Sequence, residues 1–168
     1  MKLYITTKLI LNLLLLNTNP NDEDNSKYII KNDTQVEYLD EIVRAGLQEL
    51  DIDKVRIRIV PMDNVTRYKV ESRTNQKLDA FITGRGHRYT IYIGSFSRNK
   101  YIEVLAHELI HLKQYYSKEL QIIENKVIYK DKLYYNANHI NYDYRPWEND
   151  AYADGKKLNF SIKNRLEL

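Results

Sequence analysis

The sequence predicts one α+β domain, because strand patterns and helix patterns both recur along a chain of one-domain length. The chain has 168 residues, of which 43% are apolar, enough to bury a core without disulfide bonds. Residues 55–60 and 87–94 alternate apolar and polar side chains, whereas residues 98–116 repeat apolar side chains at helical spacing. We expect residues 35–168 to form this domain and residues 1–34 to be an N-terminal extension.

Charge and cysteine content exclude several classes of protein. The net charge of +3 is too small to make nucleic acid or an anionic membrane the main partner. The chain has no cysteine, which excludes zinc ribbons, iron–sulfur clusters, thiol catalysis and disulfide bonds.

The extension contains the most apolar stretch of the chain, Leu9–Leu16. This stretch is shorter than the roughly 20 apolar residues that a membrane-spanning helix needs. Basic residues precede it, as in a signal peptide, but no small-x-small cleavage site follows. We therefore expect a strand or short helix packed on the domain, followed by a polar loop over residues 17–27.

The first half of the domain begins with a helix. Thr34 or Asp33 is suited to cap it. The apolar residues at helical spacing are Val36, Leu39, Ile42, Val43, Leu47 and Leu50. A half-buried strand follows over residues 55–60 and ends at Pro61, and residues 66–71 and 78–83 are expected to form two short strands.

The second half contains the longest helix. A glycine turn at Gly84–Gly86 leads into the strand 87–94, and the helix 98–116 follows. The apolar stripe of this helix consists of Ile102, Leu105, Leu109, Leu112 and Tyr116. Residues 127–135 have the pattern of a hairpin around Lys130–Lys132.

A last helix is expected to start at Pro146, since proline is favoured in the first turn of a helix. Gly155 is expected to end or weaken it. The apolar residues beyond that point form a tail whose structure the sequence leaves open.

The residues that indicate chemistry are His107-Glu108-Leu109-Ile110-His111, an H-E-x-x-H motif inside the long helix. Side chains at positions i and i+4 share one face of a helix, so both imidazoles can reach one metal ion. Glu108 lies beside them, where its carboxylate can contact a metal-bound water. Zinc suits such ligands, and a catalytic zinc site keeps one position open for water.

Zinc needs a third protein ligand, and the best candidate is Glu148 in the last helix. Asp150 is the competing carboxylate, but two residues correspond to about 200° of helix rotation, so only one of them can face the metal. Ala151 shares a face with Glu148 and is small enough to let the two helices approach closely. We expect Glu148 to be the ligand and Asp150 to lie outside the first set of ligands or in solvent.

Three segments together resemble the small SprT-like metallopeptidases, a group similar to the minimal gluzincins. They are Leu105–Tyr115, Lys118–Leu120 and Tyr144–Tyr152, and the resemblance covers about residues 78–155. Such stand-alone domains occur in phage and bacterial genomes. The resemblance implies a zincin-like fold: a twisted, mostly antiparallel sheet, an active-site helix carrying H-E-x-x-H, and a following helix carrying a glutamate ligand.

Matching positions imply that His107, His111 and Glu148 bind Zn²⁺ and that Glu108 is the catalytic base. The strand 87–94 matches the edge strand that lies above the cleft in this group and pairs with substrate, which points to His87, Tyr89, Thr90 and Tyr92. A donor to the oxyanion is also expected, and the sequence leaves it open among Tyr152, Tyr144, Arg145 and His139. Larger SprT-like proteins often add a four-cysteine zinc ribbon for DNA-associated work, which this chain lacks.

The function expected is therefore that of a zinc metallopeptidase acting on a peptide or protein. The alternative is a catalytically silent zinc-binding module that holds a peptide or partner by edge-strand addition. The presence of Glu108 favours the peptidase, because a binding module needs no base there. The sequence leaves the location of the protein unknown, and a bacterial host cytoplasm or a virion is expected rather than secretion.

Overall fold

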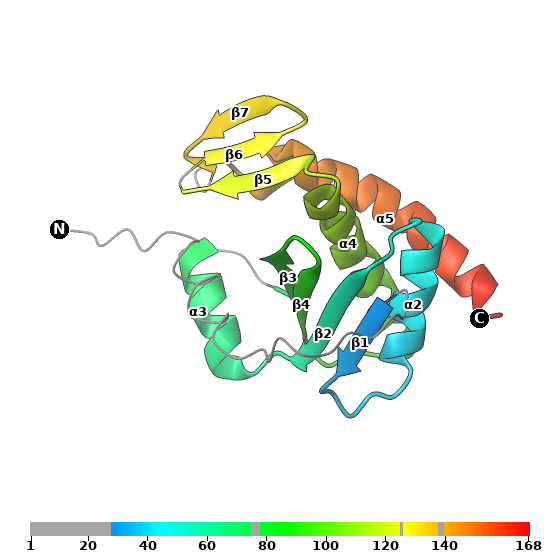
Figure 1. Ribbon diagram of the computed structural model, residues 1–168. Helices are drawn as coiled ribbons and strands as arrows, with labels where there is room; N and C mark the ends of the chain where they lie inside the picture. Colours follow the sequence, from blue (N-terminus) through cyan, green and yellow to red (C-terminus); the bar gives the residue numbers. More distant parts are fainter. Residues whose placement is uncertain (1–27, 75–77, 125, 138–139) are drawn as a thin grey trace, which may run out of the picture.

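A computed structural model describes residues 28–74, 78–124, 126–137 and 140–168, which form a mixed α+β architecture, as expected (Figure 1). The expectations for Leu9–Leu16, for the loop 17–27 and for His139 fall outside the described residues. The helices are α2 (Leu39–Glu49), α3 (Asn64–Thr74), α4 (Arg98–Tyr116) and α5 (Pro146–Arg165). The strands are β1 (Tyr28–Asn32), β2 (Val55–Pro61), β3 (Ala80–Arg85), β4 (Arg88–Ile93), β5 (Leu120–Ile123), β6 (Lys126–Tyr129) and β7 (Lys132–Tyr135).

The main sheet has the strand order β1-β2-β4-β3 and is mixed. β1 and β2 run parallel, as do β2 and β4, and only β3 is antiparallel to its neighbour. The expectation of a mostly antiparallel sheet is therefore wrong for the sheet beside the H-E-x-x-H helix. The physical reason is the connection through α2, which returns the chain to the starting end of the sheet, so that β2 runs in the same direction as β1.

β1 lies within the segment expected to be an extension. Tyr28 pairs with Val55, and the pairing continues to Asn32 opposite Ile59. Tyr28 is also buried in the core. Residues 28–32 are thus part of the sheet.

The strand expected at the edge of the sheet lies inside it. β4 is hydrogen-bonded to β2 on one side and to β3 on the other, so Tyr89, Thr90 and Tyr92 belong to an inner strand. His87 is exposed in the turn between β3 and β4. The alternation of side chains does predict which face of β4 is buried, because Tyr89, Ile91 and Ile93 are in the core. The alternation carries no information on the lateral position of a strand. Among the described strands, β1 and β3 form the two edges of this sheet.

The strand expected over residues 66–71 is wrong, because these residues belong to α3. Asp63 precedes this helix, and its Oδ1 accepts a hydrogen bond of 2.6 Å from the backbone N–H of Thr66. Such a bond satisfies one of the free N–H groups of a first helical turn. Val65 and Tyr68 are exposed, so the apolar residues of α3 reflect no buried strand face. The second short strand is confirmed as β3.

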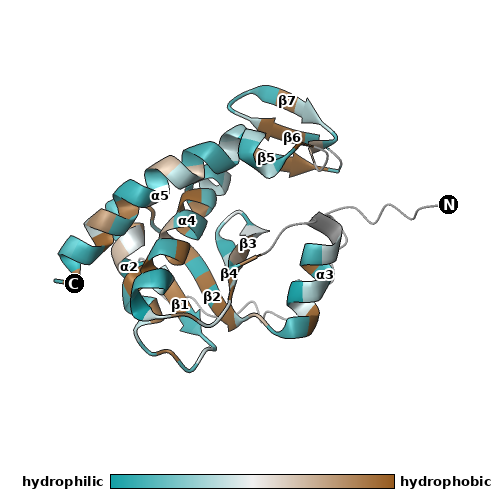
Figure 2. Ribbon diagram, turned by 180° about the vertical axis from the view of Figure 1, so that it is seen from behind, coloured by the Kyte–Doolittle hydropathy of each residue, from teal (hydrophilic) through white to brown (hydrophobic). Residues whose placement is uncertain are grey.

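The core lies between the main sheet and the helices α2, α4 and α5. Figure 1 shows these helices gathered on one side of the sheet, with α3 apart from them. The apolar stripe of α4 is buried at Ile102, Leu105, Leu109 and Leu112. Hydrophobic residues follow the same interior in Figure 2, on the strands and on the adjoining faces of the helices. Burial of this stripe leaves the opposite side of α4 for polar groups.

α5 continues through Gly155 to Arg165, so the expected break at Gly155 does not occur. Leu158 and Ile162 in its second half are buried in the core, and this burial stabilises the helix beyond the glycine. The apolar tail is therefore the C-terminal half of α5.

A small antiparallel sheet, β5-β6-β7, joins α4 to α5. The hairpin expected over residues 127–135 is confirmed, and its turn residues Lys130 and Asp131 have φ angles of 47° and 63°. Such angles suit the right-handed twist of a two-residue hairpin. Trp147 packs against this sheet in a second, smaller core with Tyr129. The described helices include none with the length and apolar character of a membrane span.

Candidate metal centre

Three side chains from two helices converge on one point. His107 and His111 lie one turn apart on α4, and Glu148 lies in the first turn of α5. The Nε2 atoms of the two histidines are 3.1 Å apart. Oε2 of Glu148 is 3.1 Å from Nε2 of His111 and 3.5 Å from Nε2 of His107. All three ligand atoms therefore lie within 4.8 Å of one another.

This spacing fits a small tetrahedral metal ion. Zinc bonds to histidine nitrogen and carboxylate oxygen at about 2.0–2.2 Å, which places ligand atoms about 3.3 Å apart. The observed separations bracket that value. Two imidazoles and one carboxylate also match the donor set of catalytic zinc sites, which leave one position open.

Gln114 fixes the orientation of His111. Its Nε2 donates a 2.9 Å hydrogen bond to the backbone carbonyl of Trp147, so its Oε1 is available as an acceptor. Oε1 lies 2.9 Å from Nδ1 of His111, which must then be the protonated nitrogen. In the neutral, metal-binding form of His111, the lone pair is thus left on Nε2, the atom that faces Glu148. Through Trp147, the same amide also holds the residue that precedes Glu148.

The electrostatics of these side chains among themselves favour an ion pair between His111 and Glu148. Burial alone raises the pKa of Glu148, but hydrogen bonds from His107, His111 and Tyr142 hold it far below its usual range. Burial lowers the pKa of His111, but the Glu148 and Glu108 carboxylates outweigh this and raise it to about 9. A metal ion must therefore displace a proton from His111 at neutral pH.

Glu108 lies next to the ligands with only 5% of its surface exposed. Loss of hydration raises its pKa, and Glu148 adds to the shift, whereas the two imidazoles and the backbone N–H of Ile82 oppose it. A raised pKa makes this carboxylate a stronger proton acceptor than an ordinary glutamate.

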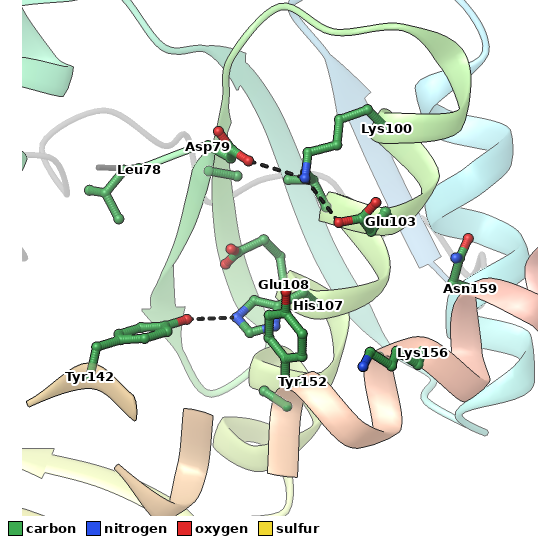
Figure 3. A pocket seen from close by; sticks show the side chains of 14 residues that line it. Leu78, Asp79, Lys100, Glu103, His107, Glu108, Tyr142, Tyr152, Lys156 and Asn159 are labelled. Atoms are coloured by element: carbon green, nitrogen blue, oxygen red, sulfur yellow. Dashed lines mark hydrogen bonds and ion pairs between the residues drawn. The ribbon is translucent and has the colours of Figure 1, made fainter. Parts of the chain in front are cut away.

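Glu108 and His107 face a cleft of about 630 Å³ between α4, α5 and the start of β3 (Figure 3). Apolar side chains from each of these three elements, including Ala80, Val104 and Ala151, line its interior. Its far end carries an ion-pair group, in which Lys100 Nζ lies 3.3 Å from Asp79 and 2.9 Å from Glu103. A second cavity of about 540 Å³ reaches Glu148.

The structure separates Asp150 from the candidate ligands. Its Oδ2 accepts hydrogen bonds from the Tyr129 hydroxyl and from Lys130 Nζ, both on the β6–β7 hairpin. It therefore fastens the small sheet to α5. Glu148 and Asp150 therefore point in different directions from α5, as expected from their separation of two residues. Ala151 is fully buried, as a close approach of α5 to α4 requires.

The four candidate oxyanion donors differ in position. Tyr144 is 76% exposed and lines neither cavity. The guanidinium of Arg145 stacks over the Tyr142 ring at 5.8 Å instead of facing the cleft. Tyr152 lines the cleft, with its ring centroid 6.0 Å from that of His107. His139 lies outside the described residues.

Two residues at this site were missed in the sequence. Gln114 follows His111 by three positions, so the two side chains share one face of α4. This spacing in the sequence could have identified Gln114 as a partner of His111. Tyr142 lines both cavities, and its hydroxyl lies 3.4 Å from Nε2 of His107. It belongs to the short 3₁₀ helix η2 (Tyr142–Tyr144), in a segment without periodicity. Burial and the Glu148 carboxylate raise the pKa of Tyr142, so its hydroxyl keeps its proton.

Comparison of the chain with protein-family models, with curated proteins and with solved structures finds no match. The chemistry of the site therefore has to be argued from its own residues.

Proposed function

We propose that the protein is a zinc metallopeptidase whose metal ligands are His107, His111 and Glu148. The observation that supports this most is the convergence of their three ligand atoms within 4.8 Å, beside a buried carboxylate that faces a cleft. A structural zinc site would be expected to be closed by a fourth protein ligand and would need no glutamate at this position.

Zinc, when bound, lowers the pKa of a coordinated water and polarises a carbonyl group. Glu108 is the group that moves protons: its carboxylate accepts one from the attacking water and then delivers it to the leaving nitrogen. Its raised pKa supports the first of these tasks. Burial of Glu108 keeps bulk water from competing for its proton.

The edge strand supports a peptide as the substrate. β3 has a neighbour only in β4 among the described strands, and Leu78, Asp79 and Ala80 at its start line the cleft beside His107. An extended peptide can pair with the free backbone groups of such an edge. Substrate pairing is thus reassigned from residues 87–94 to the β3 side of the hairpin.

The same edge also supports the alternative, a zinc-binding module that holds a peptide without cleaving it. Glu108 favours the peptidase, because burying a carboxylate is energetically costly and a module that only holds a peptide needs no proton acceptor there.

A metal-dependence experiment tests the proposal. The zinc-loaded protein is incubated with a mixed-sequence peptide library, and new termini are identified by mass spectrometry. Cleavage is expected, loss of cleavage is expected after removal of zinc with a chelator, and recovery is expected when one equivalent of zinc is returned. Retention of bound peptide without cleavage would support the binding module instead.

A further inference from the structure

We propose that Lys156 of α5 binds a carboxylate group of the substrate, so that the cleft selects peptides with an acidic side chain or a free C-terminus close to the scissile bond. The inference rests on the proposed function and names the substrate class of the same site. It is carried by the position of Lys156 along α5, by its lack of an acidic partner, and by the charges of the rest of the cleft.

Lys156 lies on the face of α5 that carries the candidate ligand Glu148. Residues 148, 152 and 156 are spaced by four, so Glu148, Tyr152 and Lys156 follow one another along one side of the helix. Tyr152 and Lys156 line both the cleft and the second cavity. Figure 3 shows the ammonium end of Lys156 directed toward the ring of Tyr152. A substrate that enters either cavity therefore meets this cation.

The cation is close enough to the metal centre to contact a residue near the scissile bond. Nζ of Lys156 lies 5.2 Å from the centroid of the Tyr152 ring, and this centroid lies 6.0 Å from that of the His107 ring. The two steps together correspond at most to about three residues of an extended peptide, each of which spans about 3.3–3.6 Å. A carboxylate within that distance of the scissile bond, on a side chain or at the C-terminus, can thus reach Lys156.

Lys156 has no carboxylate partner in the part of the chain that the structure describes. Its neighbour Lys157 is paired with Asp154 at 2.8 Å, whereas the contact of Lys156 is with the Tyr152 ring. A cation–π contact leaves N–H donors of the ammonium group available. Lys156 is also exposed, so an incoming carboxylate can bind to it without displacing another one.

The other charged groups favour Lys156 as the place for this carboxylate. At the far end of the cleft, Lys100 is shared by Asp79 and Glu103, so the group has a net negative charge and repels an anion. Asp143 lines the second cavity but not the cleft, which makes the cleft the better side for an acidic substrate. Among the described lysines and arginines that line either cavity, Lys156 alone is unpaired with a carboxylate.

A binding experiment with acidic and neutral peptides tests this role. The protein is zinc-loaded Glu108→Gln, which keeps the shape of the site and is expected not to cleave its ligand. The ligands are acetylated and amidated alanine hexapeptides with one Glu, or with Gln at the same position, and this position is moved along the peptide. A further pair contains only alanine and differs in a free or an amidated C-terminus. Calorimetry at low ionic strength gives each affinity in this background and after addition of Lys156→Gln, Lys156→Glu or Lys157→Gln.

At one position, or at two neighbouring ones, we expect the Glu peptide to bind about three- to tenfold more tightly than the Gln peptide, as for a partly solvated charge pair. Lys156→Gln should abolish this preference and Lys156→Glu should reverse it. Lys157→Gln is the matched control and should retain it, because Lys157 lines neither cavity. A preference found only between the free acid and the amide would identify the C-terminus as the source of the carboxylate.

A preference for the acidic peptide that survives in Lys156→Gln would mean that the carboxylate binds elsewhere, such as at the metal, and would overturn the role of Lys156. Equal affinity for every acidic peptide and its neutral partner in the Glu108→Gln background would overturn it as well. If the parent cleaves no peptide but the preference depends on Lys156, the proposed function fails and the carboxylate site stands. If the parent cleaves peptides and no such preference exists, the proposed function stands and this inference is wrong.

Discussion

Gly155 of α5 lies directly against the backbone of His107 in α4. A Cβ atom at position 155 would lie 3.3 Å from Cα of His107 and 3.5 Å from its backbone nitrogen. Glycine is therefore the residue that lets the helix of the third candidate ligand approach the helix of the first two. From the sequence, Gly155 was expected to end or weaken α5. In the structure, its effect is instead on the packing between α5 and α4.

Gly155→Val is expected to push the two helices apart and to weaken zinc binding, because its γ carbons have no space against a rigid backbone. Overpacking of this kind costs about 1–3 kcal/mol of folding free energy. The measurement is thermal unfolding together with a chelator titration. The matched control is Ala153→Val, on the exposed side of the same helix, which is expected to change both only slightly. Equal zinc affinity in the two variants would contradict the packing role of Gly155.

Gln114→Met is expected to lower zinc affinity by about 10–100-fold, as is usual when the partner that orients a metal-binding histidine is lost. Methionine keeps the length of the side chain, but its thioether sulfur is only a weak acceptor and does not replace the amide oxygen that faces Nδ1 of His111. The fold should persist, because the substitution conserves volume. Gln35→Met, at an exposed position, serves as the control. Unchanged zinc affinity in Gln114→Met would show that His111 orients itself without this amide.

Glu148→Ala and Asp150→Ala are expected to have different consequences. The first removes a ligand atom from the cluster and should lower zinc affinity by more than 100-fold, well beyond the roughly 10–100-fold loss seen when a supporting partner is removed. The second removes the contact of α5 with Tyr129 and Lys130 and should cost about 1 kcal/mol or less of stability, with zinc affinity retained. Competitive chelator titration compares them, and the reverse order would move the third ligand to Asp150.

The sequence predicted the parts of this site that depend on local spacing. A separation of four residues in a helix suffices to place His107 and His111 together, and a proline before an amphipathic segment suffices to start α5. The position of β4 between β2 and β3 could not be predicted from local spacing, because it depends on pairing between segments that are distant in the chain. Tyr142 was also missed. It reaches the site through the packing of an irregular segment, whose sequence has no periodic pattern of apolar residues that could have predicted its position.

The metal-free protein is expected to lose stability as the pH rises from about 6.5 to about 9. The pKa of His111 is raised to about 9 in the folded protein, so its stabilising ion pair with Glu148 is complete below the unfolded pKa and is lost as the pH passes the folded one. Melting temperatures across this range measure the effect. Glu148→Gln should flatten the profile, and an unchanged profile in that variant would contradict the ion pair.

Zinc affinity should change in the opposite direction over the same range. A proton on His111 competes with the metal, so binding is expected to tighten as the pH rises toward 9. Titration of the metal-free protein at several pH values, with release of protons recorded, checks this relation. Affinity that is independent of pH would mean that zinc does not displace the proton of His111.

Glu108 is proposed to move the protons of a zinc-dependent peptide hydrolysis. The most direct measurement is the rate of peptide cleavage by Glu108→Gln relative to the parent, at equal zinc content, with the exposed Glu41→Gln as the control. The amide keeps the shape of the side chain but cannot accept a proton, so the rate should fall by about 10²–10⁴-fold, while Glu41→Gln cleaves as the parent does. Equal rates in the parent and in Glu108→Gln would contradict the account.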